Sequence, residues 1–161
     1  MVNRRLVLVI AAVGAALSVV GGTAVSTRAA DGVASVDAAW TKAVTTGNLD
    51  AVVACYAPDA VAWLPQQPEA KGREAIRASY QQLFAANTIK DVVFSQTHYH
   101  TMGDRSIGWG RVSLTFVPKA GGAATVVISR FTEVAERRGN GWVYLVDHAS
   151  DDPVTTRTGA K

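Results

Sequence analysis

One segment of the chain, residues 47–76, constrains the fold more than any other. It opens with a glycine that ends one helix, and Asn48 follows as the cap of a second, short helix whose apolar side chains recur at helical spacing. Pro58 breaks that helix, a short apolar strand is predicted over residues 60–64, and a further helix over residues 73–84. This order places an apolar strand beneath two helices.

The spacing of apolar residues changes along the chain from the period of a helix to that of a strand. A first helix is predicted over residues 35–46, whereas apolar and polar residues alternate beyond residue 88. The alternation predicts four antiparallel strands in a meander, over residues 89–100, 106–117, 125–137 and 142–150. Three N-terminal helices packed on a strongly curved antiparallel sheet form an α+β, cone-shaped single domain. The open end of the cone is the expected pocket for a small ligand.

The first 30 residues form a segment of their own. Arg4 and Arg5 precede a long uncharged apolar stretch, and small residues follow it, which is the pattern of an export signal. An exported protein, periplasmic or secreted, is therefore expected. The alternative is an uncleaved leader that anchors the protein in a membrane through residues 6–25. The expected boundaries are a signal peptide over residues 1–30, a cone domain over 31–153 and a disordered tail over 154–161.

Basic and acidic residues are balanced outside this leader. The whole chain holds 16 Lys and Arg against 13 Asp and Glu, a formal net charge of +3 at pH 7. Arg4, Arg5 and Arg28 lie among the first 30 residues, which contain no acidic residue, so the rest of the chain carries 13 charges of each sign. A neutral domain gives no reason to expect a nucleic-acid partner.

The order of elements resembles the nuclear transport factor 2-like superfamily, which includes ketosteroid isomerases and SnoaL-like polyketide cyclases, over nearly all of residues 33–153. In the C-terminal half, residues 98–104, 129–134 and 148–150 are similar to the association (hub) domain of calcium/calmodulin-dependent kinase II. Both resemblances imply the cone fold. The hub resemblance also implies assembly of several copies.

The resemblance does not carry over the catalytic residues of the isomerases. It implies Trp40 in place of the oxyanion-binding tyrosine, Leu64 in place of the general-base aspartate, and Ser129 near the position of the protonated aspartate. A leucine cannot take a proton, and an indole donates a weaker hydrogen bond than a phenol, so that chemistry requires other residues. The arginines of the hub pocket are likewise replaced, at Ser113, Glu133 and Ala149.

Four ionisable residues on predicted strands are the candidate acids and bases: His98, His100, Glu133 and His148. His98 and His100 point to one face of a strand, and His148 lies on the last strand of the same sheet. Three imidazoles can bind zinc, but histidines at i and i+2 also occur by chance and two strands separate the groups, so no metal and no cofactor is expected. Asp147 precedes His148, yet strand neighbours point to opposite faces, which argues against a direct pair.

Aromatic side chains and two arginines are the candidate ligand contacts. They are Tyr56, Trp63, Tyr80, Phe84, Trp109, Arg111 and Arg130. The aromatic rings suit a flat ligand, although a domain of this size also needs most of its aromatic residues in the core. Glu133 is expected to meet an arginine inside the cone, either Arg111 on the adjacent strand or Arg130, and such a pair would orient a polar ligand. A solvent-facing salt bridge is the alternative.

These observations predict an exported domain that binds a small hydrophobic or carbonyl-bearing organic molecule and forms a homodimer or higher homo-oligomer through the outer face of its sheet. One alternative is an enzyme of the ketosteroid isomerase or polyketide cyclase type that acts on a carbonyl substrate. The other is a ligand-free association module, for which a filled or collapsed pocket is expected. Membrane contact is expected only through an uncleaved leader.

Overall fold

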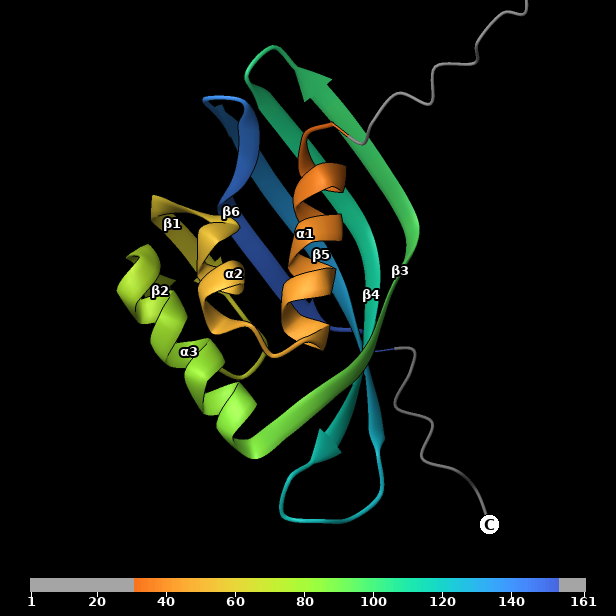
Figure 1. Cartoon of the computed structure of the whole chain (residues 1–161). Coiled ribbons are helices and arrows are strands. Elements are labelled where there is room, and N and C mark those ends of the chain that lie inside the picture. Colours follow the sequence, from red (N-terminus) through yellow and green to blue (C-terminus); the bar gives the residue numbers. More distant parts are fainter. Residues whose placement is uncertain (1–30, 154–161) are drawn as a thin grey trace, which may run out of the picture.

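Three helices cover one face of a curved sheet in the computed structural model, which describes residues 31–153 (Figure 1). The predicted leader and the predicted tail lie outside the described residues. The helices are α1 (Val33–Thr45), α2 (Leu49–Ala54) and α3 (Gly72–Ala86). The strands are β1 (Tyr56–Trp63), β2 (Ala70–Lys71), β3 (Asn87–Met102), β4 (Arg105–Pro118), β5 (Thr125–Arg138) and β6 (Gly141–Asp151).

The strands form one sheet in the order β2-β1-β6-β5-β4-β3. Strands β3 to β6 make the predicted antiparallel meander, and β1 adds to it parallel to β6, with Trp63 opposite His148. The sheet curls around the helices without closing on itself (Figure 1). The predicted α+β cone fold is therefore confirmed.

The turn between the first two helices follows the sequence signals that predicted it. Gly47 has a φ of 65°, in the left-handed region that favours glycine, and it directly follows Thr46, the C-cap residue of α1. The side chain of Asn48 accepts a hydrogen bond from the backbone N–H of Ala51 at 3.0 Å, as expected of a helix cap. The turn sends α2 back against α1 and toward β1.

The structure corrects two details of the expected elements. Helix α2 ends at Ala54 rather than at Pro58, and β1 already begins at Tyr56, so Tyr56 lies on a strand and not on a helix. Pro58 lies within β1, and β2 is a short strand that the sequence pattern did not predict. The parallel pairing with β6 explains the first correction, because it extends β1 toward its N-terminal end.

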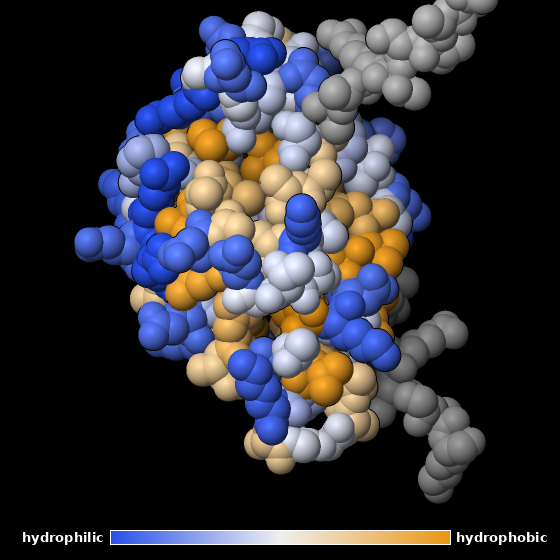
Figure 2. Space-filling model, viewed as in Figure 1, coloured by the Kyte–Doolittle hydropathy of each residue, from blue (hydrophilic) through white to orange (hydrophobic). Residues whose placement is uncertain are grey.

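The alternation of side chains along each strand gives the sheet two different faces. The inner face, covered by the helices, carries Val112, Phe131 and Asp147, all of which are buried. The outer face carries Trp109, Arg130 and His148, all of which are exposed. Figure 2 shows the helical side of the molecule, where apolar side chains gather among charged ones. Within residues 31–153, no helix has both the length and the apolar character to cross a membrane.

Candidate functional site

A cavity of about 270 Å³ lies between the inner face of the sheet and helices α1 and α3. Its volume is close to the lower end of the range of about 300–1,000 Å³ that is usual for small-molecule sites. Its wall is mainly apolar, formed by Trp40, Leu64, Leu83, Phe94, Val112, Leu114, Phe116, Val127 and Phe131. No lysine, arginine or histidine of the described residues lines it.

Two carboxyl groups face each other in this otherwise apolar wall. Glu133 on β5 and Asp147 on β6 are opposite one another across the two strands, and both line the cavity. Their exposed fractions are only 5% and 6%. Two buried acids at one point of an apolar wall are costly to ionise together, so their environments decide their protonation states.

Asp147 is the final acceptor in a chain of hydrogen bonds. The Trp40 indole N–H donates to the Tyr80 hydroxyl at 2.8 Å, and the Tyr56 hydroxyl donates to Asp147 Oδ2 at 2.6 Å. The two phenol oxygens lie 2.8 Å apart. Since Tyr56 has one proton and gives it to Asp147, Tyr80 must be the donor to Tyr56. Every donor in the chain thus points toward the carboxyl of Asp147.

The pKa of Asp147 reflects a balance between burial and this chain. Burial raises it from the ordinary value of 3.8 to about 6, while the hydrogen bond from Tyr56 lowers it. The negative charge of Asp37 raises it further, and the positive charge of His148 lowers it. Asp147 therefore changes its charge in the range in which general bases operate near neutral pH.

Glu133 is held in its protonated form. Burial raises the pKa of Glu133 well above its usual value, the charges of Asp147 and Asp37 raise it further, and a hydrogen bond shared with Asp37 acts in the same direction. Its proton therefore lies on the bond to Asp37. The other oxygen, Oε2, has no hydrogen-bond partner among the described residues, although it is buried.

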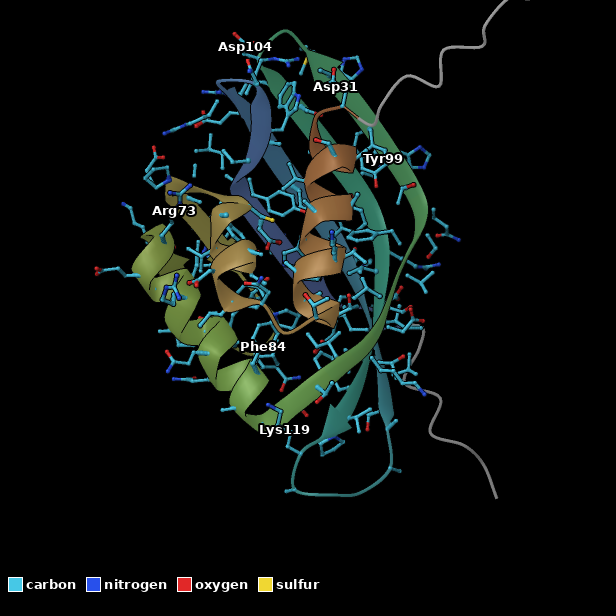
Figure 3. All side chains as sticks on the ribbon, viewed as in Figure 1. Asp31, Arg73, Phe84, Tyr99, Asp104 and Lys119 are labelled. Atoms are coloured by element: carbon cyan, nitrogen blue, oxygen red, sulfur yellow. The ribbon has the colours of Figure 1, made fainter. Side chains whose placement is uncertain are left out.

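Asp37 on α1 anchors this pair from behind. Its carboxyl accepts hydrogen bonds from Tyr144 at 2.6 Å and from Tyr99 at 2.7 Å. Burial raises the pKa of Asp37, whereas the hydrogen bonds from Tyr144, Glu133 and Tyr99 lower it. Figure 3 shows Tyr99 on β3 beside α1. With three donors, Asp37 is the best placed of the three acids to carry a negative charge.

Chemically, the arrangement pairs an acid with a potential base inside a dry cavity. Glu133 supplies a proton and an unoccupied oxygen, while Asp147 ionises near neutral pH and is oriented by Tyr56. Carboxyl groups whose environments separate their pKa values are the usual basis for dividing acid and base roles.

Of the residues that the sequence proposed, Tyr80 and Glu133 line the cavity and Tyr56 lies directly behind it. Trp40, Leu64 and Ser129, which the isomerase resemblance placed at catalytic positions, also line it. Phe84 packs against Tyr80 at a ring distance of 6.1 Å, but it borders a different hollow, between the start of β3 and Lys119, which follows β4 (Figure 3).

The remaining proposed residues lie on the outer face of the sheet. His98, Trp109 and His148 occupy one row across the strands, and Trp63 continues it on β1. Arg111 and Arg130 lie in the next row, opposite each other. The expected pairing of Glu133 with an arginine inside the cone does not form, because the sheet separates them.

The three histidines are too widely spread to bind one metal ion. Strand β6, which carries His148, is three strands away from β3, which carries His98 and His100. Neighbouring strands are about 4.8 Å apart, so three spacings far exceed the reach of a shared ligand set. Residues 31–153 contain no group of three His, Cys, Asp or Glu side chains placed to hold a metal.

Sequence reasoning missed Asp37 and did not assign Asp147 to the cavity. A signal for both existed. Asp37 lies four residues after Val33 and three before Trp40, on the inward stripe of α1, and Asp147 shares the period-two set of β6 with Ala149. An acidic residue at such a position must be paired or neutral, which makes it a candidate site residue.

A cone of helices and curled sheet, with an apolar cavity and ionisable groups at one point of its wall, defines a class of small α+β proteins. The chain matches the family model of the SnoaL-like domain over residues 37–145. The protein belongs to the SnoaL-like family. No curated protein matches the chain.

Solved structures with the same fold come from several bacteria. A candidate calcium/calmodulin-dependent protein kinase II association domain from Xanthomonas campestris is 26% identical with a TM-score of 0.69, covering 75% of this chain and 86% of that one. A ketosteroid isomerase-like protein from Erwinia carotovora atroseptica is 21% identical with a TM-score of 0.64, covering 72% and 90%. A candidate dehydratase of the NTF2-like family from Streptomyces avermitilis is 18% identical with a TM-score of 0.62, covering 75% and 94%.

Proposed function

We propose that the protein binds a small, neutral, largely apolar organic molecule that carries a hydroxyl group at one end. The observation that carries this proposal is the buried, unpartnered Oε2 of Glu133, which lies opposite Asp147 in an apolar cavity. The Glu133 proton is engaged with Asp37, so Oε2 of Glu133 and the carboxylate of Asp147 both accept hydrogen bonds from the cavity, and a hydroxyl group supplies the missing donor.

The charge of the cavity supports a neutral ligand. Its acids are Glu133 and Asp147 together with Asp151, while its described lining has no basic side chain, so an anion would meet repulsion without a counter-charge. A strongly cationic ligand is disfavoured by the loss of hydration in an apolar cavity. The open cavity also favours ligand binding over the ligand-free association module, for which a filled pocket was expected.

The test is calorimetric titration of the purified protein with 5,6,7,8-tetrahydro-2-naphthol and with tetralin, which lacks the hydroxyl. We expect the alcohol to bind at least about tenfold more tightly, the value of roughly one hydrogen bond to a buried charged or unpartnered group. Glu133→Met removes the acceptor and should abolish the difference. Glu133→Gln keeps both a donor toward Asp37 and a free oxygen, so it should retain most of it.

Glu74→Gln, on the exposed surface of α3, is the matched control for the loss of one carboxyl group. Equal affinity for the alcohol and for tetralin in the wild-type protein would refute the proposal, as would unchanged discrimination in Glu133→Met.

A second candidate, an enzyme acting on a carbonyl substrate, is favoured by the pKa of Asp147. In that reaction Asp147 takes a proton from the carbon beside the carbonyl. The Glu133 carboxyl turns its proton away from Asp37 and donates it to the carbonyl oxygen, which leaves a neutral enol and an ionised Glu133. The ketosteroid isomerase-like neighbour supports this candidate at the level of the fold.

Export through residues 1–30 and assembly through the outer face stay predictions.

Deuterium exchange at the carbon beside the carbonyl of 2-tetralone, followed by NMR, tests the enzyme. Exchange faster than in buffer, lost in Asp147→Asn, would establish it. Exchange at the buffer rate at every pH between 5 and 8 would leave binding alone as the function of the cavity.

A further inference from the structure

A second hollow, of about 470 Å³, lies on the face of the sheet opposite the cavity. We call it the outer hollow, and its side chains come from three neighbouring strands, β3, β4 and β5. They are Gln96, His98, Trp109, Arg111, Arg130 and Thr132. The proposed function makes no use of any of these residues.

The backbone is distorted where the outer hollow forms. The pairing of β3 with β4 shifts register between Ser95 and His98, and Gln96 within this bulge has a φ of 51°, in the left-handed region that non-glycine residues rarely adopt. Gly110 lies beneath it, and a Cβ there would be 2.9 Å from the carbonyl oxygen of Gln96. Strain of this kind persists where surrounding structure imposes it, and it gathers at functional sites.

Two arginines lie side by side in the outer hollow. Arg111 and Arg130 are directly opposite on β4 and β5, an arrangement that is unfavourable for like charges. Arg111 is compensated, since its Nε lies 2.5 Å from Asp152 Oδ2 and its Nη1 donates to Gln96 Oε1 at 2.9 Å. Arg130 makes no ion pair with any residue of the described part of the chain. The hollow therefore holds one uncompensated positive charge.

An aromatic surface lies diagonally beside that charge. Trp109 is two residues from Arg111 along β4, and its side chain is 45% exposed. His98 stacks on it with ring centroids 5.4 Å apart and an interplanar angle of 18°. Thr132, opposite Trp109, adds a hydroxyl group. Exposed stacked rings at a hollow are suited to hold a flat ring by its face or edge.

We propose that the outer hollow binds a small organic monoanion in which a carboxylate is attached to a flat ring. The carboxylate pairs with the guanidinium of Arg130, whose planar fork matches its two oxygens, and the ring lies against Trp109. A single negative charge matches the single uncompensated arginine better than a phosphate dianion does. The inner cavity, which is lined by acids, cannot accept this ligand with comparable affinity.

The experiment is calorimetric titration of the full-length chain with 2-naphthoate, and with its neutral counterpart 2-naphthamide and inorganic phosphate as comparisons. We expect 2-naphthoate to bind more tightly than either, and Arg130→Gln to weaken it by about tenfold or more, the usual value of a charge-assisted pair. Trp109→Leu should weaken 2-naphthoate but leave phosphate unchanged. Lys90→Gln removes one exposed positive charge elsewhere on β3 and should change nothing.

The same measurements can overturn the proposal. Unchanged 2-naphthoate affinity in Arg130→Gln, or equal affinity for 2-naphthamide in Glu133→Met, where the inner cavity lacks its acceptor for the amide, would show that the carboxylate is not recognised. Phosphate bound as tightly as 2-naphthoate would remove the aromatic part. The assembly predicted through the outer face would cover this same hollow. If sedimentation shows a dimer that Arg130→Gln weakens, and the dimer does not bind 2-naphthoate, a second copy occupies the hollow and the ligand proposal is overturned. Glu133→Met should leave 2-naphthoate binding intact, which separates this site from the inner cavity.

Discussion

The two faces of the same sheet treat charge in opposite ways. On the inner face, Glu133 and Asp147 are buried, and burial raises the pKa of both. On the outer face, Arg111 on β4 is paired with Asp152, and Arg130, three residues before Glu133 on β5, is open to solvent. Strand neighbours thus differ in chemistry because of the helices that cover one face and not the other. The comparison predicts that mutations inside the cone affect stability and proton binding strongly, whereas those outside affect mainly ligands.

The largest expected effect comes from removing the carboxyl group behind the cavity. Asp37→Ala leaves the hydroxyls of Tyr144 and Tyr99 without their acceptor, and we expect the free energy of unfolding to fall by about 3–4 kcal/mol. Urea denaturation measures it. Asp50→Ala is the control, because its ion pair with Arg77 is exposed and should contribute less than about 1 kcal/mol. Similar losses in the two variants would break the contrast between charges buried under the helices and charges open to solvent.

The second prediction concerns how stability depends on pH. The pKa of Asp147 is raised from 3.8 to about 6, so the folded state holds a proton that the unfolded state has already lost. Stability should therefore fall as pH rises from about 4 to about 6, by up to roughly 1.4 kcal/mol per pH unit from this group. The raised pKa values of Glu133 and Asp37 act with the same sign.

Urea denaturation at a series of pH values checks this slope. Asp147→Asn should flatten it between pH 4 and 6, whereas Arg130→Gln on the outer face should leave it unchanged. A wild-type protein that gains stability over this interval would contradict the assigned environment of the inner acids.

The sequence predicted the fold well because both helical and strand periods are strong, and the Gly47–Asn48 turn fixed where one helix stops and the next begins. It predicted the site less well. Alternation separates each strand into two sets but does not say which set the helices cover, so Trp109, Arg111 and Arg130 were expected in the cone together with Tyr80 and Glu133. Their positions depend on the curl and on long-range pairing, which no local pattern contains.

Asp37 illustrates the same limit in a helix. A single carboxylate on α1 is read as part of the solvated side, yet Asp37 is 3% exposed. The two tyrosines that donate hydrogen bonds to its carboxyl, Tyr99 and Tyr144, lie 62 and 107 residues away in the sequence. Only the assembled fold brings three donors to one carboxyl group and makes its burial tolerable.

The third prediction tests the hydrogen-bond chain at the cavity. Tyr56→Phe removes the donor to Asp147, and because that bond lowers the pKa of Asp147, the pKa should rise by about one unit. Carboxyl ¹³C chemical shifts followed by NMR across pH would report it. Tyr99→Phe, which removes a donor from Asp37 instead, should move the Asp147 titration less. An unchanged titration in Tyr56→Phe would mean that burial alone sets the pKa.

The smallest expected effect is also the most direct test of what the histidines do. His148 is exposed on the outer face, and its ring meets Trp63 edge-on at 6.2 Å, so His148→Ala should change the free energy of unfolding by less than about 0.5 kcal/mol. Binding of tetrahydro-2-naphthol should stay within about twofold of the wild type, since the sheet lies between His148 and the cavity. His148 does lower the pKa of Asp147 through its charge, so His148→Ala should shift that titration slightly upward. A large loss of ligand binding with the fold intact would restore His148 as a site residue and would show that the two faces of the sheet are not chemically separate.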